Sequence, residues 1–355
     1  ARSESPAAVA DSRGGSRLRR ARPASGTPTS AGGEGLLPAV TRGPVPLTKE
    51  ALLGATGLQR GGKESVDAFL HRVSHLKLQG QRLGPALGEL LHTVASVSVV
   101  YAYDNLLSSL SGIEHLRRLQ LLYLQNNRLC SMAGIEALTN LRILHLGNNR
   151  LSRIEGLEHC TKLEELHVPN QRPFLAGGGE GGLGSFGGGD ALEFCPSSVE
   201  AIAYTLTSLS AAGNRLQDVS CLAPLQGLRT LDLSNNDLQQ VSDVRPLLSG
   251  RFLTKVELNG NPLAINERKH RSMVVLSAPA IEEIDGKAVL PQEKDFVRRL
   301  EMQKMKLQAQ RHAHHSRQRH GLAASPVRAP MKAGGGSGPL GYGGAPPILQ
   351  DFRVS

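Results

Sequence analysis

A leucine pattern that recurs every 22 residues constrains this chain more than any other feature of its sequence. Three copies in register, at 119–129, 141–151 and 163–173, follow the spacing Leu-x-x-Leu-x-Leu-x-x-Asn-x-Leu, with Gln171 in the asparagine position of the third. The same frame fits five more stretches and brings the count to eight: 73–83, 97–107, 206–216, 228–238 and 253–263. A fixed period of this length indicates a solenoid of stacked units.

Each unit is expected to form one short strand and one return. The two leucines of Leu-x-Leu point to one face of the strand and the intervening residue points to the other. At 22 residues, a unit has room on its return only for a 3₁₀ or single-turn helix, as in the Gly-Ile-Glu-x-Leu pieces at 112–116 and 134–138. We therefore expect an α/β fold: a leucine-rich solenoid of about eight repeats, with a curved parallel sheet on the concave side, short helices on the convex side and a cap at each end.

An asparagine follows most of the strands, where the chain turns away from the sheet. Its amide can satisfy backbone groups that the turn leaves without partners in the sheet, so these asparagines are expected to form a buried structural ladder and to have no catalytic role. The predicted ladder consists of Asn105, Asn127, Asn149, Asn214, Asn236 and Asn261.

The ends of a solenoid need covers. At the front, 64–76 predicts a helix, and at the back a helix over 268–276 precedes a closing segment that begins at Pro279. The residues expected to be buried in the front cap are Val66, Phe69, Leu70 and Val73, and those in the back cap are Met273, Leu276, Ile281 and Ile284.

The units at Leu163 and Leu206 are 43 residues apart, nearly twice the period, which indicates an insertion. A glycine-rich tract at 176–190 behaves as a flexible linker, and the helix expected after Pro196 has Ser197 and Glu200 at the spacing of a capping box. The predicted organisation is a disordered basic segment at 1–44, an N-terminal helical cap at 45–72, repeats at 73–265 with the insertion at 176–190, a C-terminal cap at 266–290, a basic helix at 291–320 and a disordered tail at 321–355.

The chain has a formal net charge of +10. Part of this charge lies in 291–320, which has eight Lys or Arg against three acids and is either a solvated extension of the cap or a docking site for an acidic partner. No apolar run of membrane-spanning length and no signal-peptide core is present, and four cysteines without CxxC spacing favour a reducing compartment, so we expect a soluble cytoplasmic protein. Cys130 and Cys160 are expected to pack on the convex side.

Function is expected on the concave face, where each strand contributes one residue to every column. Aromatic anchors are typical of interface hot spots, and an open face of this length favours a protein partner over a small ligand. The residues predicted to contact a partner are Tyr101, Tyr103, Asp104, Tyr123, Gln125, His145, Glu165, His167, Asp232 and Glu257.

A metal site at His145, Glu165 and His167 is not expected, because parallel strands place any such pair side by side and a closed site needs a fourth ligand. No serine or cysteine lies in a nucleophile elbow, so no catalytic residues are predicted. The glycine tract lacks the Lys and Ser/Thr of a phosphate loop. The sequence therefore predicts a protein that is not an enzyme and has no cofactor or metal.

With 22-residue units and Gly-Ile-Glu-x-Leu returns, the chain resembles the SDS22-like subfamily of leucine-rich repeats. That subfamily includes regulators of protein phosphatase 1, an axonemal dynein light chain and a spliceosomal protein. The stretches 103–105, 122–127, 165–172 and 258–262 and the lengthened fifth unit are similar to a phosphatase 1 regulatory subunit. The resemblance implies binding and regulation of the phosphatase 1 catalytic subunit through the concave face, since a Lys/Arg-Val-x-Phe docking motif is lacking.

The same resemblance implies γ-tubulin or a kinesin as further partners, and a place on the cytoskeleton at the centrosome or microtubule-organising centre, in male germ cells. Two alternatives stay open: a structural protein of the cilium that associates with dynein or tubulin, and a ribonucleoprotein scaffold. Nucleic acid is the weaker alternative, because the basic residues avoid the concave columns and lack interleaved aromatic residues.

Overall fold

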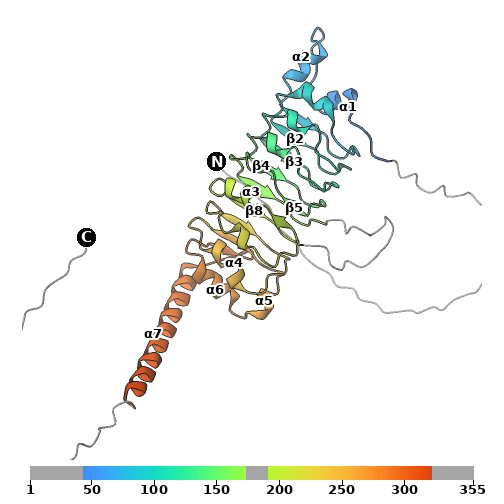
Figure 1. Cartoon of the computed structure of the whole chain (residues 1–355). Coiled ribbons are helices and arrows are strands. Elements are labelled where there is room, and N and C mark those ends of the chain that lie inside the picture. The colour runs from blue at the N-terminus through green and yellow to red at the C-terminus, as the bar shows by residue number, and fades with distance from the viewer. Residues whose placement is uncertain (1–42, 173–190, 322–355) are drawn as a thin grey trace, which may run out of the picture. The chain divides into compact units, whose positions relative to one another are not determined.

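The computed structural model describes residues 43–172 and 191–321. Ten short strands form one sheet in the order β1-β2-β3-β4-β6-β8-β9-β10-β11-β12 (Figure 1). All neighbours are parallel except β11 and β12, which are antiparallel. The strands are β1 (His75–Lys77), β2 (Val99–Tyr101), β3 (Leu121–Tyr123), β4 (Ile143–His145), β6 (Glu165–His167), β8 (Ser208–Ser210), β9 (Thr230–Asp232), β10 (Lys255–Glu257), β11 (Glu283–Ile284) and β12 (Lys287–Ala288). The predicted leucine-rich-repeat solenoid is confirmed, and the closing segment adds two strands to the eight expected.

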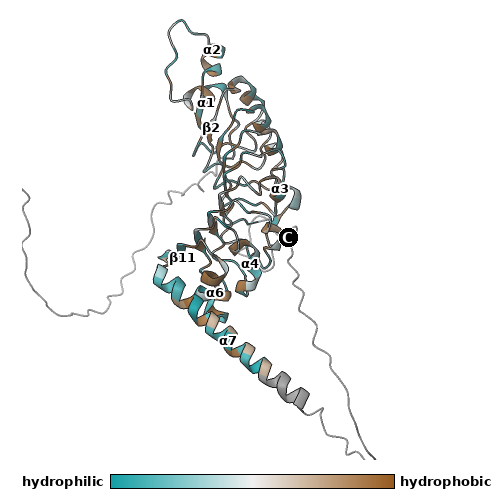
Figure 2. Ribbon diagram, turned by 90° about the vertical axis from the view of Figure 1, so that its left-hand side faces the viewer, coloured by the Kyte–Doolittle hydropathy of each residue, from teal (hydrophilic) through white to brown (hydrophobic). Residues whose placement is uncertain are grey.

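The core lies between the sheet and the returns. The central residue of each repeat strand is buried, as at Leu122, Leu144 and Leu166, and the apolar residue two positions later is buried in the same way. Figure 2, coloured by hydropathy, shows brown and teal segments interspersed along the ribbon of the repeats. Stacking one repeat on the next joins these side chains into one continuous core, which a single repeat has no means to build.

The six asparagines of the predicted ladder are buried, between 2% and 7% exposed, and Gln171 takes the same place in the fifth unit. Each asparagine amide donates to the carbonyl three residues before it and to a carbonyl of the preceding repeat, and its oxygen accepts a backbone N–H from that repeat. For Asn127 these bonds run to Leu124 O at 2.9 Å, to Ala102 O at 2.9 Å and from Leu107 N at 3.1 Å. The ladder therefore joins each repeat to its neighbour through the backbone.

The returns differ along the solenoid. Four are 3₁₀ helices: η1 (Glu89–Val94), η2 (Ile113–His115), η3 (Ile135–Ala137) and η4 (Ser220–Leu222). The expected 3₁₀ returns at 112–116 and 134–138 are confirmed, and the eighth repeat is preceded by a full α-helix, α4 (Val241–Leu248). Cys160 is fully buried as expected, whereas the prediction for Cys130 was wrong, because its side chain is exposed.

The 43-residue interval does not interrupt the sheet. β6 and β8 pair directly, with Leu166 opposite Leu209. A small second sheet forms beside the insertion from β5 (Arg153–Ile154) and β7 (Glu193–Phe194), followed by α3 (Pro196–Ala201). The helix was expected, but the capping box was wrong: Ser197 and Ser198 lie inside the helix and both donate to Glu158 at 2.8 Å. The tract at 176–190 lies outside the described residues.

The front cap consists of two short helices, α1 (Lys49–Gly54) and α2 (Val66–His71). The single helix predicted over 64–76 was wrong in extent, because the chain leaves α2 after His71 to start β1 at His75. Of the four predicted contacts, Phe69, Leu70 and Val73 are fully buried and Val66 is partly buried. The disorder predicted for 1–44 and 321–355 falls almost entirely outside the described residues.

The back cap contains α5 (Leu263–Asn266), α6 (His270–Ser277) and the β11–β12 hairpin. Ile281 and Ile284 are buried as predicted, but Met273 and Leu276 are 38% and 39% exposed. The prediction used the wrong face of α6: Val274 and Val275 point into the core instead.

The predicted basic helix is α7 (Pro291–Gly321). Its first turns are attached to the cap, where Val297 is buried and Arg271 pairs with Glu293 at 2.8 Å. Beyond them Leu300 and Leu307 are 39% and 54% exposed. No helix in the described ranges is both long and apolar enough to cross a bilayer.

Candidate protein-binding face

The strand register places six of the ten predicted contact residues in one column across the sheet. Tyr101 is opposite Tyr123, Tyr123 is opposite His145, and His145 is opposite His167. The column continues through Ser210 and Asp232 to Glu257. Because every pair is parallel and in register, the side chains of the column leave the sheet on the same side, at the strand spacing of about 4.8 Å.

The first four members of this column form a continuous stack of rings, which we call the ring stack (Tyr101, Tyr123, His145, His167). The ring centroids are 5.1 Å apart between the two tyrosines, 4.9 Å between Tyr123 and His145, and 4.1 Å between the two histidines. The first and last of these pairs are nearly parallel, with interplanar angles of 11° and 17°. All four side chains are partly buried, so the stack is a preformed, semi-rigid surface.

Burial in the stack alters the acid–base chemistry of its members. Desolvation, with a smaller effect from the neighbouring His167, lowers the pKa of His145 from 6.5 to about 4. Desolvation also raises the pKa of Tyr123 above its usual value of 10.0. Both groups are therefore uncharged near neutral pH.

A second column lies two residues before the ring stack on the same face. It begins with Val99, which is 6% exposed, continues with Leu121 and Ile143, which are partly exposed, and reaches Glu165 on β6. The ring stack and this apolar column lie side by side on β2, β3 and β4, and together they make the apolar half of the face.

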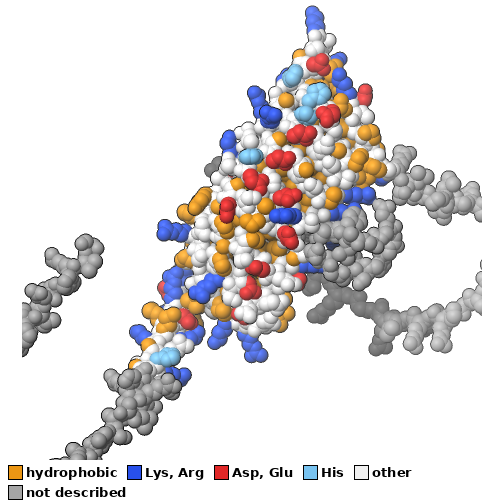
Figure 3. All heavy atoms as spheres, viewed as in Figure 1, with side chains coloured by type: hydrophobic (Ala, Val, Ile, Leu, Met, Phe, Trp, Pro, Cys, Tyr) orange, Lys and Arg blue, Asp and Glu red, His pale blue; other side chains and the backbone are white. Residues whose placement is uncertain are grey.

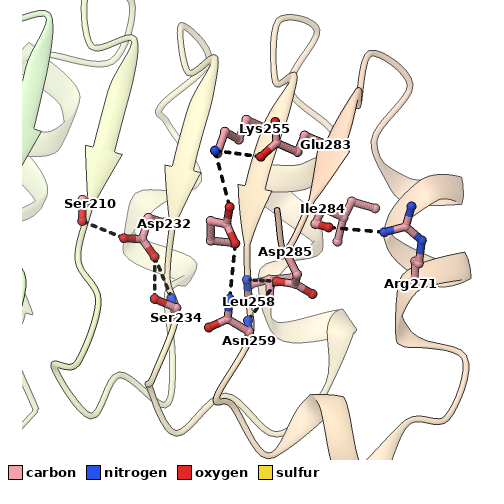
Figure 4. Close-up of polar contacts among 11 residues, drawn as sticks. Ser210, Asp232, Ser234, Lys255, Leu258, Asn259, Arg271, Glu283, Ile284 and Asp285 are labelled. Carbon is pink, nitrogen blue, oxygen red and sulfur yellow. Dashed lines mark hydrogen bonds and ion pairs between the residues drawn. The ribbon is translucent and has the colours of Figure 1, made fainter. Parts of the chain in front are cut away.

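The other half of the face is acidic and internally paired (Figure 4). Asp232 accepts hydrogen bonds from Ser210 Oγ at 2.9 Å and from Ser234 Oγ at 2.7 Å. Lys255 Nζ lies 2.8 Å from a Glu283 oxygen and 3.5 Å from a Glu257 oxygen. The two predicted acids, Asp232 and Glu257, therefore lie on the expected face but already have partners within the chain.

The remaining predicted contacts lie where the strands end. Tyr103 and Gln125 are partly buried, and Gln125 Oε1 is buried with no hydrogen-bond partner among the described residues. Asp104 is exposed, with φ of 57°, and accepts a hydrogen bond of 2.7 Å from Asn126 Nδ2. Asn126 in turn accepts one of 2.7 Å from Asn148. Sequence reasoning missed this second, exposed ladder; its signal was the Asn-Asn doublet at 126–127 and 148–149.

The returns carry a row of acidic side chains that was not predicted. Figure 3 shows acidic side chains in a row along the repeats. Glu114 accepts a 2.8 Å hydrogen bond from Gly112 N, and Glu136 accepts one from Gly134 N at the same distance. Both glycines have positive φ, 98° and 103°. These glutamates therefore stabilise the start of the 3₁₀ turns η2 and η3, which accounts for the Gly-Ile-Glu signature.

Comparison with known proteins identifies the same repeats. Residues 139–175 match the family model for two copies of the leucine-rich repeat, and residues 227–248 match a single-repeat model. A curated relative, leucine-rich repeat-containing protein ODA7 of Chlamydomonas reinhardtii, is 34% identical over 79 residues. That match covers 22% of this chain and 18% of the relative, so the shared segment spans about a fifth of the relative's length.

Solved structures of similar fold include internalin C2 from Listeria monocytogenes, with 20% identity and a TM-score of 0.46 over 60% of this chain and 83% of that one. A leucine-rich-repeat protein of Leptospira interrogans has 18% identity and a TM-score of 0.47, over 61% of this chain and 50% of that one.

Proposed function

We propose that the leucine-rich repeats of this chain form a non-enzymatic scaffold that binds a protein partner through the sheet face, and that this partner is the catalytic subunit of protein phosphatase 1. The observation that supports the binding face is the ring stack, a preformed surface flanked by the apolar column on the same strands. The identity of the partner rests on the resemblance to SDS22-like regulators in the repeats and in the stretches around Tyr103 and Leu258.

The size and chemistry of the face suit a folded partner. Eight repeat strands at about 4.8 Å extend roughly 34 Å, the dimension of a standard protein interface. Tyrosine rings held by their neighbours lose little conformational entropy when a partner covers them, and such residues carry a large share of binding energy in interfaces. We expect Tyr101 and Tyr123 to be the main anchors, with His145 and His167 extending the same surface.

The test is capture of the phosphatase 1 catalytic subunit by the full chain and by a Tyr101→Ala/Tyr123→Ala variant. Loss of two hot-spot rings should weaken binding at least about 30-fold, because one such residue contributes roughly 2 kcal/mol or more. Tyr204→Ala is the matched control, since that tyrosine is 83% exposed and lies outside the sheet face. Equal capture by the double variant and the control, with both folded by circular dichroism, would contradict the proposed face.

A structural protein of microtubules or cilia is the second candidate, and α7 favours it. The part of α7 with described side chains has six Lys or Arg and three acids, and its described side chains after Val297 are exposed, except for the partly exposed Glu301. Such a helix suits an acidic surface such as that of tubulin. In this candidate γ-tubulin or a kinesin is the partner and the location is the centrosome or another microtubule structure in the cytoplasm.

Truncation after Arg298 separates the two candidates, because it leaves Val297 and the Glu293 pair with the cap intact. Microtubule co-sedimentation should be lost in the truncated chain while phosphatase capture is kept. Co-sedimentation of the truncated chain at the level of the full chain would exclude α7 as the microtubule contact.

A further inference from the structure

Three metal-ligating side chains meet at the end of the ring stack. His145 on β4 and His167 on β6 are direct partners in the parallel register. Glu165 lies two residues before His167 on the same strand, so it leaves the sheet on the same side. One nitrogen from each imidazole and one carboxylate oxygen all lie within 4.8 Å of one another, and all three side chains are partly buried.

We propose that His145, His167 and Glu165 bind one Zn²⁺ ion, in a site with two imidazoles, one carboxylate and an open fourth position. Zinc prefers this set of nitrogen and oxygen ligands, at about 2.0–2.2 Å from the metal, and sites that keep an open position have three protein ligands. Two ligand atoms of one tetrahedral zinc are therefore roughly 3.5 Å apart. The present ligand atoms lie within 4.8 Å of one another, so zinc binding requires the three side chains to close in. The two imidazoles must also turn out of their near-parallel stack, because the lone pair of each nitrogen lies in the plane of its ring.

The position of the carboxylate favours a metal. Zinc binds an imidazole through a neutral nitrogen and a carboxylate through an oxygen, so the two groups must lie side by side. Glu165 already contacts the neighbouring histidine, with Glu165 Oε2 3.4 Å from His167 Nε2, which holds the carboxylate beside the nitrogen that would bind the ion.

The sequence alone argued against a metal here, because any two histidines on adjacent strands lie side by side. The structure adds that a carboxylate converges with both of them. A second group, Glu89, Glu114 and His115, also brings three ligand atoms together. It has only one imidazole, its Glu89 side chain is 80% exposed, and Glu114 already accepts a hydrogen bond from Gly112. We therefore assign the zinc site to the sheet face.

The open fourth position would face solvent at the point where a partner covers the ring stack. Water fills it in the free chain, and an imidazole, carboxylate or thiolate of a partner would replace the water in a complex. The zinc site does not depend on the identity of that partner, because the three protein ligands come from this chain alone. Its test therefore needs no partner, and its failure would leave the proposed phosphatase contact untouched.

The experiment is titration of the full-length, metal-free chain with Zn²⁺ by calorimetry and with Co²⁺ by visible absorption, at pH 7.5. The variants are His145→Ala, His167→Ala and Glu165→Gln, with His115→Ala as the matched histidine control. The histidines between 312 and 320 are the same in every protein, so any zinc they bind cancels in the comparison. Circular dichroism in EDTA checks that each variant is folded.

We expect wild type and His115→Ala to bind one more equivalent of Zn²⁺ than the His145 and His167 variants. Affinity in those two variants should fall at least about 100-fold, more than the 10–100-fold typical when a group outside the ligand shell is lost. Glu165→Gln keeps the size of the side chain and should weaken zinc and change the Co²⁺ bands without altering the fold. Equal stoichiometry and affinity in wild type and a folded His167→Ala variant would overturn the site.

Discussion

Replacing one buried ladder asparagine tests how the repeats are held together. Asn149 is 2% exposed. Its amide donates to Leu124 O at 3.0 Å and to Leu146 O at 2.8 Å, and its oxygen accepts from Leu129 N at 3.0 Å. Asn149→Ala removes these three bonds at once, together with a longer one of 3.4 Å to Gly147 O, and no water reaches a position this well buried without rearrangement of the turn.

The cost follows from which backbone groups keep another partner. Leu124 O still accepts from Asn127 Nδ2 at 2.9 Å, and Leu146 O still accepts from Gln171 Nε2 at 2.8 Å. Each of these carbonyls loses one of its two hydrogen bonds, which costs about 0.5–1 kcal/mol of stability per bond. The Leu129 N–H loses its partner entirely and remains buried, and an unsatisfied buried donor costs about 1–3 kcal/mol of stability. Together the substitution should lower the free energy of unfolding by about 3 kcal/mol.

Urea denaturation followed by circular dichroism measures this loss, and Asn140→Ala is the matched control. Asn140 also bridges two repeats, donating to Arg117 O at 2.9 Å and accepting from Lys162 at 2.7 Å, but these bonds lie at the surface. Water replaces them, so the control should lose less than about 1 kcal/mol. Asn149→Asp should be worse than alanine, because it turns a carboxylate toward two carbonyls. A loss below about 1 kcal/mol for Asn149→Ala would refute the accounting.

Two further predictions concern the returns and the ring stack. Gly112→Ala should lower the free energy of unfolding by about 3 kcal/mol in a urea titration, because φ is 98° and a Cβ would lie 2.2 Å from Gly88 O, a backbone atom. Gly156→Ala is the control and should cost only about 1 kcal/mol, because the atom nearest to its Cβ would be a side-chain oxygen at 3.6 Å. Equal costs for the two substitutions would contradict the steric argument. The pKa of His145 is about 4 in the folded chain and near 6.5 unfolded, so the unfolded state binds the proton more readily between these values and stability should fall as the pH drops from 6.5 to 4. Allowing for solvent screening of a partly exposed ring, the loss is about 1–2 kcal/mol. Urea titrations at pH 7 and pH 4.5 should show this difference shrink in His145→Asn, and an unchanged difference would exclude His145 as its source. The ionisable groups that face His145 are Tyr123, Glu165 and His167.

The sheet was predictable because its cause is local and repeated. A 22-residue period with a leucine pair and an asparagine at fixed offsets leaves one way to stack the units, and the register of Tyr101, Tyr123, His145 and His167 follows from counting. Even the 43-residue interval leaves the register intact, because the Leu166–Leu209 pairing and the asparagine ladder are set by the residues at its two ends.

The caps were less predictable because they lack a repeat. At 64–76 the helical spacing of apolar residues continues into Val73, but Val73 is buried from an extended segment that leads into β1. In α6, two adjacent valines and two flanking apolar residues fit either face of the helix, and only packing against α4 decides that Met273 and Leu276 remain exposed. Periodicity gives the type of an element with more certainty than its ends or its buried face.

Side-chain chemistry on the sheet face was predictable in position and not in detail. Counting places His145 beside His167, but the approach of Glu165 to the same point depends on rotamers. The hydrogen bonds of Asp232 with Ser210 and Ser234 depend on rotamers as well. Because of these bonds, the Asp232 carboxylate already has hydrogen-bond partners within the chain.

The two halves of the face should therefore contribute differently to the free energy of the proposed binding. In the acidic half, Asp232 and Lys255 already have partners within the chain, and a charge that keeps such partners gains little free energy from one more contact near solvent. In the apolar half, the exposed edges of the ring stack and of Leu121 and Ile143 gain from every part of their surface that a partner removes from water. In the proposed complex, binding free energy should therefore come mainly from β2, β3, β4 and β6.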